Sequence, residues 1–441
     1  MSDSKCGHYR IMRLYLPFAA AMAALAIPAG LTATKANSLP ADNEKLALTG
    51  AKIYPSPSEP PIADGVVVVR GAKIAAVGKS GSVAIPADAK VLDCKGLIVA
   101  AGFQNSHVHF TEAKWDNAAS QPAAQLGQDL SDMLTRYGFT TVVDLASSLP
   151  NTTALRVRIQ SGEIPGPRIL TAGGGVYPPK GTPFYLRDTL PPAVLEYLEA
   201  VEEPATPDAA RKLVLAEING GADVVKLFVG ALLSPTEVRV MPPEIAAAAV
   251  AEAHRHGRMV FAHPSNLEGL EVALEGGVDV LAHTTPMSGR WDAALIPKLK
   301  EHGMSLIPTL KLWGYELHKA EAPPAAVQQY DAAAAGQLLQ YRRAGGQILF
   351  GTDVGYMTDY DPSEEYALMS QAGLTGMQIL DSLTTAPAAR FGESASRGQV
   401  APGMDADIVV LAADPARDAR NFASVRYTIR RGRVIYPVPS N

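Results

Sequence analysis

Apolar, β-branched runs separated by polar segments dominate the middle of the chain. Nearly continuous hydrophobicity is typical of a parallel strand that is covered on both faces. The intervening segments, such as PPEIAAAAVAEAHRHG, space their apolar residues as a helix does. Eight alternations of strand and helix predict a (β/α)8 TIM barrel over residues 99–395, and therefore an α/β fold. The eight runs lie at residues 96–110, 140–146, 168–176, 222–230, 258–266, 279–286, 304–313 and 347–355.

The two ends of the chain have a different pattern, in which short apolar runs alternate with glycine-containing turns. The pattern covers residues 46–98 and returns near the C-terminus in DADIVVLAADP and VRYTIRRGRVIY. Such runs predict short β-strands. Because these ends flank the barrel, we expect residues 37–98 and 396–441 to pair into one small discontinuous β-sandwich domain.

The first residues have the pattern of a secretory signal. Lys5, Arg10 and Arg13 precede the apolar run LYLPFAAAMAALAIPAGLTA, and a polar stretch follows it. We interpret residues 1–36 as a signal peptide, so the protein is expected to be exported, with the periplasm as its location. A retained membrane anchor is the alternative, but the run is marginal in length for a span and contains two prolines. No stable membrane insertion is expected after cleavage.

Composition and charge restrict the classes of partner. The chain has 441 residues, of which 47% are hydrophobic and 19% charged, so a sizeable core is expected. The net charge is -5 and no long basic run occurs, which argues against nucleic acid as a partner. Removal of the signal leaves Cys94 as the single cysteine, so no intramolecular disulfide is expected. The expected partner is a small-molecule substrate, and a homo-oligomer is compatible with the sequence.

Four of the nine histidines lie at the C-terminal ends of predicted strands, where the active site of a barrel forms. His107 and His109 are two residues apart on a strand, so their side chains point to the same face. His263 and His283 end the fifth and sixth runs, and Asp353 ends the eighth. A single histidine is more often a hydrogen-bonded structural residue. Four histidines at the C-terminal ends of predicted strands, however, are poorly explained by chance. Imidazoles with a carboxylate indicate a site for zinc or a similar divalent metal.

Lys226 is unexpected in the apolar run ADVVKLFVG, because burying its cation costs free energy. The alternative is that its side chain extends to solvent. At the predicted end of the fourth strand, however, it lies beside the histidines. A neutral lysine amine can capture carbon dioxide and become a carbamate, which bridges two cations as a carboxylate would. We therefore expect two divalent metal ions, with zinc as the metal, and carbon dioxide bound as a carbamate on Lys226.

These residues together resemble the amidohydrolase superfamily over nearly the whole mature chain. The resemblance rests on the flanking β-rich ends, GFQNSHVHF, VVKLF, the two later histidines, GTD and PGMDADIVVL. It is closest to the imidazolonepropionase-like and Xaa-Pro dipeptidase-like subgroup. Imidazolonepropionases are mononuclear and are not expected to use this lysine, so Lys226 favours the dipeptidase-like, binuclear side.

The resemblance also implies a division of the ligands. His107, His109 and Asp353 would hold the more buried metal. The two later histidines would hold the more exposed one, and carboxylated Lys226 would bridge them.

The expected function is metal-dependent hydrolysis of amide (C–N) bonds in small molecules, such as dipeptides or N-acyl amino acids, by a metal-activated hydroxide. Asp353 is the expected catalytic residue, which accepts the water's proton and passes it to the leaving nitrogen. One alternative is an imidazolonepropionase-like enzyme that opens a cyclic amide or a lactone. Another is a non-catalytic binding protein on the same scaffold, against which the presence of all six candidate ligands argues.

The sequence evidence for residues that contact the substrate is weaker than the evidence for the metal ligands. Tyr177 and Tyr185 belong to a proline-rich segment after the third run, which forms either part of a lid or plain surface. Lys311, expected at the end of the seventh strand, and Arg290 are candidates for binding a substrate carboxylate, and each is otherwise solvated. Trp313 either lines the pocket or packs.

Overall fold

The computed structural model describes residues 44–187, 190 and 192–438. The predicted signal peptide at residues 1–36 lies outside the described residues, so cleavage and export stay predictions. Within the described ranges, no helix has both the length and the apolar character needed to cross a membrane.

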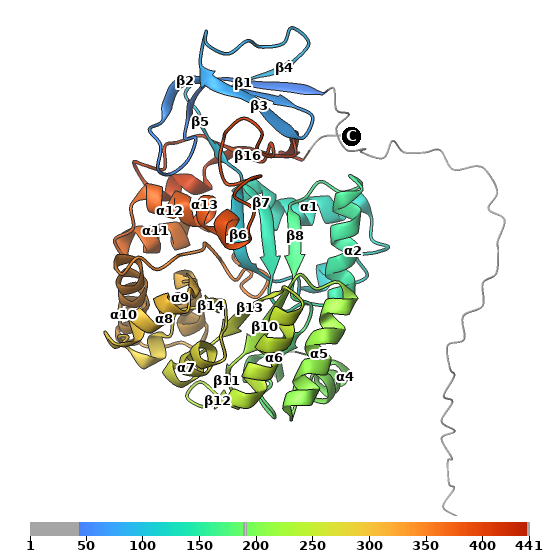
Figure 1. Ribbon diagram of the computed structural model, residues 1–441, viewed down its shortest axis with the longest axis vertical. Coiled ribbons are helices and arrows are strands. Elements are labelled where there is room, and N and C mark those ends of the chain that lie inside the picture. Colours follow the sequence, from blue (N-terminus) through green and yellow to red (C-terminus); the bar gives the residue numbers. More distant parts are fainter. Residues whose placement is uncertain (1–43, 188–189, 191, 439–441) are drawn as a thin grey trace, which may run out of the picture. The chain divides into compact units, whose positions relative to one another are not determined.

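Both ends of the chain contribute to one eight-stranded sheet with the order β18-β17-β16-β5-β1-β2-β3, in which β4 also pairs with β1 (Figure 1). The antiparallel pairing of β5 with β16 joins the two ends, and β5 continues to Ala101, three residues beyond the predicted boundary. The strands are β1 (Lys45–Ile53), β2 (Ile62–Arg70), β3 (Lys73–Lys79), β4 (Lys90–Asp93), β5 (Ile98–Ala101), β16 (Ile408–Leu411), β17 (Val425–Arg430) and β18 (Arg433–Tyr436).

This sheet folds onto itself around a core of its own. The turn between β17 and β18 meets the turn between β2 and β3 so closely that a Cβ at Gly432 would clash with the carbonyl of Gly71. Alternate residues of β16 face two different cores, because Ile408 and Val410 join the core of the sheet whereas Val409 and Leu411 join that of the barrel. Burial on both faces explains why this strand is continuously apolar.

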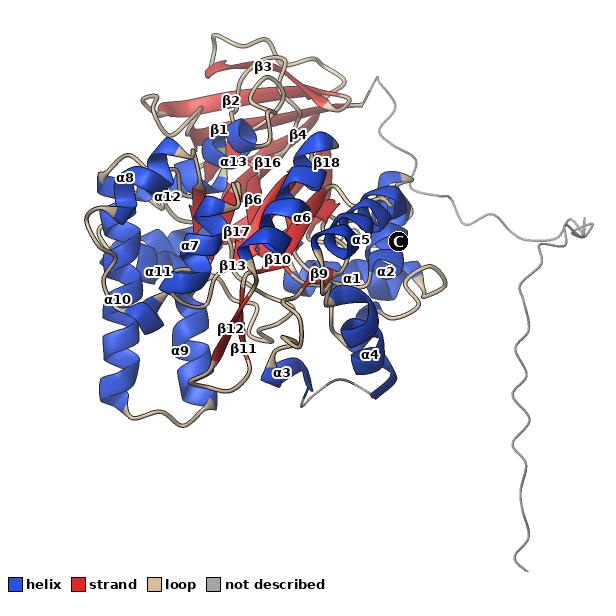
Figure 2. Ribbon diagram, turned by 60° about the horizontal axis from the view of Figure 1, so that its bottom comes forward, coloured by secondary structure: helices blue, strands red, loops and turns tan. Residues whose placement is uncertain are grey.

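The barrel consists of parallel strands arranged in a ring, as predicted. The third apolar run forms two short strands, of which β8 pairs with β7 and β9 with β10. Helices cover the outside of the ring (Figure 2). The barrel strands are β6 (Phe103–Val108), β7 (Phe139–Asp144), β8 (Arg168–Thr171), β9 (Gly175–Val176), β10 (Val224–Phe228), β13 (Met259–His263), β14 (Val280–Ala282) and β15 (Ser305–Ile307).

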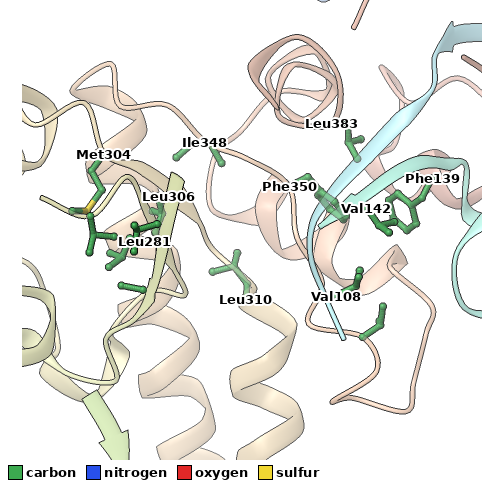
Figure 3. Close-up of a cluster of buried hydrophobic side chains, with 14 of the residues drawn as sticks. Val108, Phe139, Val142, Leu281, Met304, Leu306, Leu310, Ile348, Phe350 and Leu383 are labelled. Carbon is green, nitrogen blue, oxygen red and sulfur yellow. The ribbon is translucent and has the colours of Figure 1, made fainter. Parts of the chain in front are cut away.

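The eighth predicted strand is not a regular strand, although its segment closes the ring. Isolated parallel bridges join Ile348 to Leu306 on one side and Val354 to Val108 on the other. The amide of Ser106 in β6 donates to the carbonyl of Phe350 at 2.7 Å. Figure 3 shows Phe350 beside Val142 in a cluster of buried hydrophobic side chains that also includes Leu383.

The remaining elements are the helices and one hairpin of strands. In α6, the predicted apolar face is buried through Ile245, Ala249 and Ala253. The hairpin consists of β11 (Gly230–Leu232) and β12 (Val238–Val240). The helices are α1 (Ala123–Met133), α2 (Leu149–Gln160), α3 (Phe184–Arg187), α4 (Pro192–Tyr197), α5 (Pro207–Gly220), α6 (Pro243–Arg255), α7 (Leu267–Glu275), α8 (Leu295–Glu301), α9 (Leu310–Lys319), α10 (Pro324–Arg343), α11 (Ser363–Gln371), α12 (Gly376–Leu383) and α13 (Thr385–Arg390).

Candidate metal centre

Five of the six predicted ligands lie on barrel strands or directly after them, and Asp353 lies in the eighth segment, which closes the ring through isolated bridges. His107 lies in β6 and His109 follows it, His263 is the last residue of β13, and His283 follows β14. Lys226 is the middle residue of β10 rather than its end, so its long side chain must reach along the strand to approach the histidines. In a barrel the carboxyl ends of the parallel strands share one rim, which explains why segments far apart in sequence meet there.

Three of these side chains form a compact buried group. The Nε2 atom of His109 lies 2.8 Å from Oδ1 of Asp353, and Nε2 of His107 lies 3.4 Å from the same oxygen. The two Nε2 atoms are 3.2 Å apart. One ligand atom from each residue falls within 4.8 Å of the others, so His107, His109 and Asp353 together could hold a metal ion.

The two later histidines extend this group. The Nε2 atom of His283 lies 3.9 Å from Oδ2 of Asp353. Its ring centroid is 4.7 Å from that of His107 and 4.6 Å from that of His263. The structure thus brings four imidazoles and one carboxylate into continuous contact.

Burial controls the charge of these groups. It lowers the pKa values of His107, His263 and His283, and the positive charge of Lys226 lowers them further, so these imidazoles are neutral at neutral pH. Burial also lowers the pKa of Lys226 to about 7, although the charge of Asp353 acts in the opposite direction. Neutral imidazoles are the form that binds metals, and a large share of the lysine is a neutral amine near pH 7.

Several buried polar atoms in the candidate metal centre lack hydrogen-bond partners, which is compatible with a cation bound there. Within the described part of the chain, Nζ of Lys226, Nδ1 of His107 and Oδ1 of Asp353 are buried without a hydrogen bond of acceptable geometry. Buried polar groups are normally satisfied, and leaving them without partners costs free energy. Neutral imidazoles with a carboxylate are a donor set that suits a divalent transition metal.

Comparison of the whole sequence with protein families identifies the group to which the chain belongs. The sequence profile of the amidohydrolase family matches residues 98–435. The chain belongs to the amidohydrolase family. This match confirms the predicted superfamily.

Curated relatives match this amidohydrolase over part of their length. An uncharacterized protein of Mycobacterium tuberculosis is 26% identical over 205 residues, which cover 44% of this chain and 52% of that protein. The ochratoxinase of Aspergillus niger is 26% identical over 230 residues, which cover 49% of this chain and 46% of the ochratoxinase. The chain therefore spans about half the length of the curated relatives that it matches.

Solved structures resemble this amidohydrolase over most of its length. A protein from Bifidobacterium longum provisionally assigned as a prolidase is 25% identical with a TM-score of 0.76, covering 90% of this chain and 96% of that one. A Xaa-Pro dipeptidase with bound methionine is 21% identical with a TM-score of 0.74, covering 89% of this chain and 99% of that one. The likeness to the dipeptidase shows the shared fold.

Several residues at the barrel rim have a strained backbone and contact the candidate ligand histidines. The sequence pattern did not reveal these contacts. Five residues that are not glycine have positive φ angles at the rim, two of them the candidate ligands His283 at 81° and Asp353 at 62°. The other three contact candidate ligands: the carbonyl of Ala146 accepts from Nδ1 of His109 at 3.1 Å, the hydroxyl of Thr309 lies 2.7 Å from Nδ1 of His283, and that of Ser265 lies 3.1 Å from Nε2 of His263. Such strain is concentrated at functional sites, and no sequence periodicity reports it.

The predicted substrate contacts lie in three different environments. Tyr185 packs against Tyr356 at the rim, with ring centroids 5.4 Å apart. Tyr177 is buried and stacks on Phe228, which itself stacks on His263, so Tyr177 supports the wall of the site. The ring of Trp313 lies 6.1 Å from that of His283, and its Nε1 donates to Thr284.

Lys311 does not end a strand, contrary to the prediction. The strand β15 stops at Ile307, and Lys311 lies in the first turn of α9. Its Nζ forms an ion pair with Asp359 at 2.8 Å and donates to the carbonyls of Asp359 and Asp361, so it ties down the loop before α11. Arg290 is exposed.

Proposed function

We propose that this amidohydrolase is a binuclear metal-dependent hydrolase that cleaves C–N bonds of dipeptides or N-acyl amino acids. The observation that carries the proposal is the buried group of His107, His109 and Asp353, with the unpartnered Nζ of Lys226 in the same site. The chain's N-terminal sequence pattern further leads us to propose that the protein is exported to the periplasm.

The close grouping of His107, His109 and Asp353 supports the proposed division of ligands. His107, His109 and Asp353 would hold one divalent ion, with zinc as the proposed metal, and His263 with His283 would hold the second. Two divalent cations, when bound, supply polarisation of the scissile carbonyl and activation of a water molecule.

Lys226 would join the two positions as a carbamate. The nitrogen lone pair of the neutral amine would add to the carbon of carbon dioxide, and the nitrogen would lose a proton to solvent, so a neutral amine would become an anion. Burial without a partner and a pKa of about 7 both support this modification, because only the neutral amine reacts. The product would also remove the cost of an unpaired ammonium group in the core.

Asp353 is the proposed proton carrier. Its carboxylate lies between His109 and His283, with Oδ1 near the first imidazole and Oδ2 near the second. From this position Asp353 would accept a proton from the attacking water and deliver it to the leaving nitrogen. The hydrogen bonds of His109 with Ala146 and of His283 with Thr309 orient both rings so that their Nε2 atoms face Asp353.

A panel of substrates tests the proposed bond class. The protein, supplied with divalent metal and bicarbonate, should hydrolyse dipeptides or N-acyl amino acids faster than lactones or cyclic amides of similar size. Structural neighbours named as a prolidase and a Xaa-Pro dipeptidase support dipeptides as the first class to assay. Activity restricted to lactones or cyclic amides would contradict the proposed substrate class.

A further inference from the structure

We propose that Glu316 recognises a positively charged group of the substrate, an ammonium or a guanidinium, at the mouth of the metal centre. This inference rests on the proposed function, because it assigns a substrate feature to the same site. Glu316 belongs to α9, on a helical face that also carries Trp313 beside His283.

Residues from three separate segments of the chain meet beside the carboxylate of Glu316. The hydroxyl of Tyr356 donates to Oε1 of Glu316 at 3.0 Å. Tyr356 follows the eighth segment, and its ring meets that of Tyr185 in α3 at an interplanar angle of 62°. Loops after different barrel strands therefore fix the position of one carboxylate, as is usual for binding sites in this fold.

The side chains of Glu316, Tyr185 and Tyr356 lie close to Asp353. Burial is the largest cause that raises the pKa values of Glu316, Tyr185 and Tyr356, and the charge of Asp353 adds to the increase in each of them. All three side chains are thus within electrostatic reach of the carboxylate to which we assign proton transfer.

The carboxylate of Glu316 has unused capacity for a cation. It is partly buried, and Tyr356 is the one side chain in the described ranges that forms a hydrogen bond with it. The nearest cation on the same helix, Lys319, is exposed and lies over the ring of Tyr356 at 5.7 Å. Its charge lowers the pKa of Glu316, but among the described residues the two side chains form no ion pair. A partly desolvated carboxylate is stabilised by a cation that donates hydrogen bonds to it, and aromatic rings favour the same charge. An anionic group in this place would be repelled by both Glu316 and Asp353.

Three hydroxamates that bind metal centres test the proposal by calorimetry. Lysine hydroxamate and norleucine hydroxamate differ in the side-chain ammonium, whereas norleucine hydroxamate and its N-acetyl derivative differ in the α-ammonium. In at least one pair, the metal-loaded wild type should bind the member with the additional ammonium group about tenfold or more tightly, as expected for a hydrogen-bonded charge. The pair that shows the preference identifies the source of the cation.

The variant Glu316→Gln should lose this preference while it binds the member of the pair that lacks the tested ammonium group as the wild type does. Glu321→Gln removes an exposed charge just beyond the same helix and should keep the preference. Equal affinities within both pairs in the wild type, or a preference that survives in Glu316→Gln, would overturn the inference and leave the proposed hydrolase intact. Absence of binding by all three hydroxamates would instead refute the metal centre itself, and the inference with it.

Discussion

A buried carboxyl group, Glu202, and a half-buried one, Glu217, make the stability of the fold depend on pH. Glu202 accepts from the amide of Gly175 at 3.2 Å, and Glu217 accepts from the amide of Gly174 at 3.3 Å. Burial, and next the charge of Glu217, raise the pKa of Glu202 to about 8. Gly175 pairs with Lys226 in the barrel, so this turn supports the strand that carries the proposed carbamate.

The direction of the effect follows from the raised pKa. A carboxyl group whose pKa is higher in the folded state stabilises the fold while it is protonated, so its contribution is complete below the unfolded value of 4.5 and is lost as the pH rises through about 8. Each unit of difference corresponds to about 1.4 kcal/mol, so the free energy of unfolding should fall by a few kcal/mol across this window. Tyr177 and Tyr197, which also face Glu202, have pKa values raised above 10 and stay neutral there.

Urea unfolding of Glu202→Gln and the wild type, from about pH 5 to about pH 9, measures how much Glu202 contributes to the free energy of unfolding. The variant keeps a neutral acceptor for Gly175, so it should be more stable than the wild type by a few kcal/mol at the upper pH and nearly equal at the lower. Glu199→Gln, which changes an exposed carboxylate in the same segment, should follow the wild type throughout. A difference between Glu202→Gln and the wild type that does not change with pH would refute the reasoning.

Two further substitutions probe the metal centre. Lys226→Ala should lose turnover, and a short carboxylic acid in the buffer should restore part of it whereas the corresponding amide should not; wild-type turnover without rescue would contradict the carbamate. Asp353→Asn should lower turnover by about a hundred- to ten-thousand-fold while its melting temperature stays near that of the wild type. Asp353→Asn with full metal content and wild-type turnover would show that another group carries the proton.

The barrel and the positions of the candidate ligand histidines were predictable because both depend on local pattern. Strands buried on both faces are continuously apolar, and each of these histidines lies at or near the end of such a run. The pairing of both chain ends was also predictable, since β5 and β16 have the same apolar character. The eighth strand was predicted as regular, but Asp353 adopts a positive φ angle and the segment forms only bridges, which its composition does not reveal.

The supporting residues were not predictable because their roles depend on contacts between distant segments. Thr309 orients His283 from the next strand, and Tyr356 orients Glu316 across a separation of 40 residues. Lys311 was misplaced because the predicted seventh run extended through Pro308 and Thr309 into the apolar residues of α9, whereas β15 ends at Ile307. Backbone conformation at the rim, rather than hydrophobic period, decides which side chains face the site.

Metal content measured together with activity tests the central claim most directly. Elemental analysis of purified protein should give about two divalent ions per chain, since six ligands are too many for one tetrahedral ion. Hydrolysis of the best C–N substrate should disappear on chelation and return as the second equivalent of metal is added back. Full hydrolytic activity in protein that carries no stoichiometric divalent metal would contradict the account.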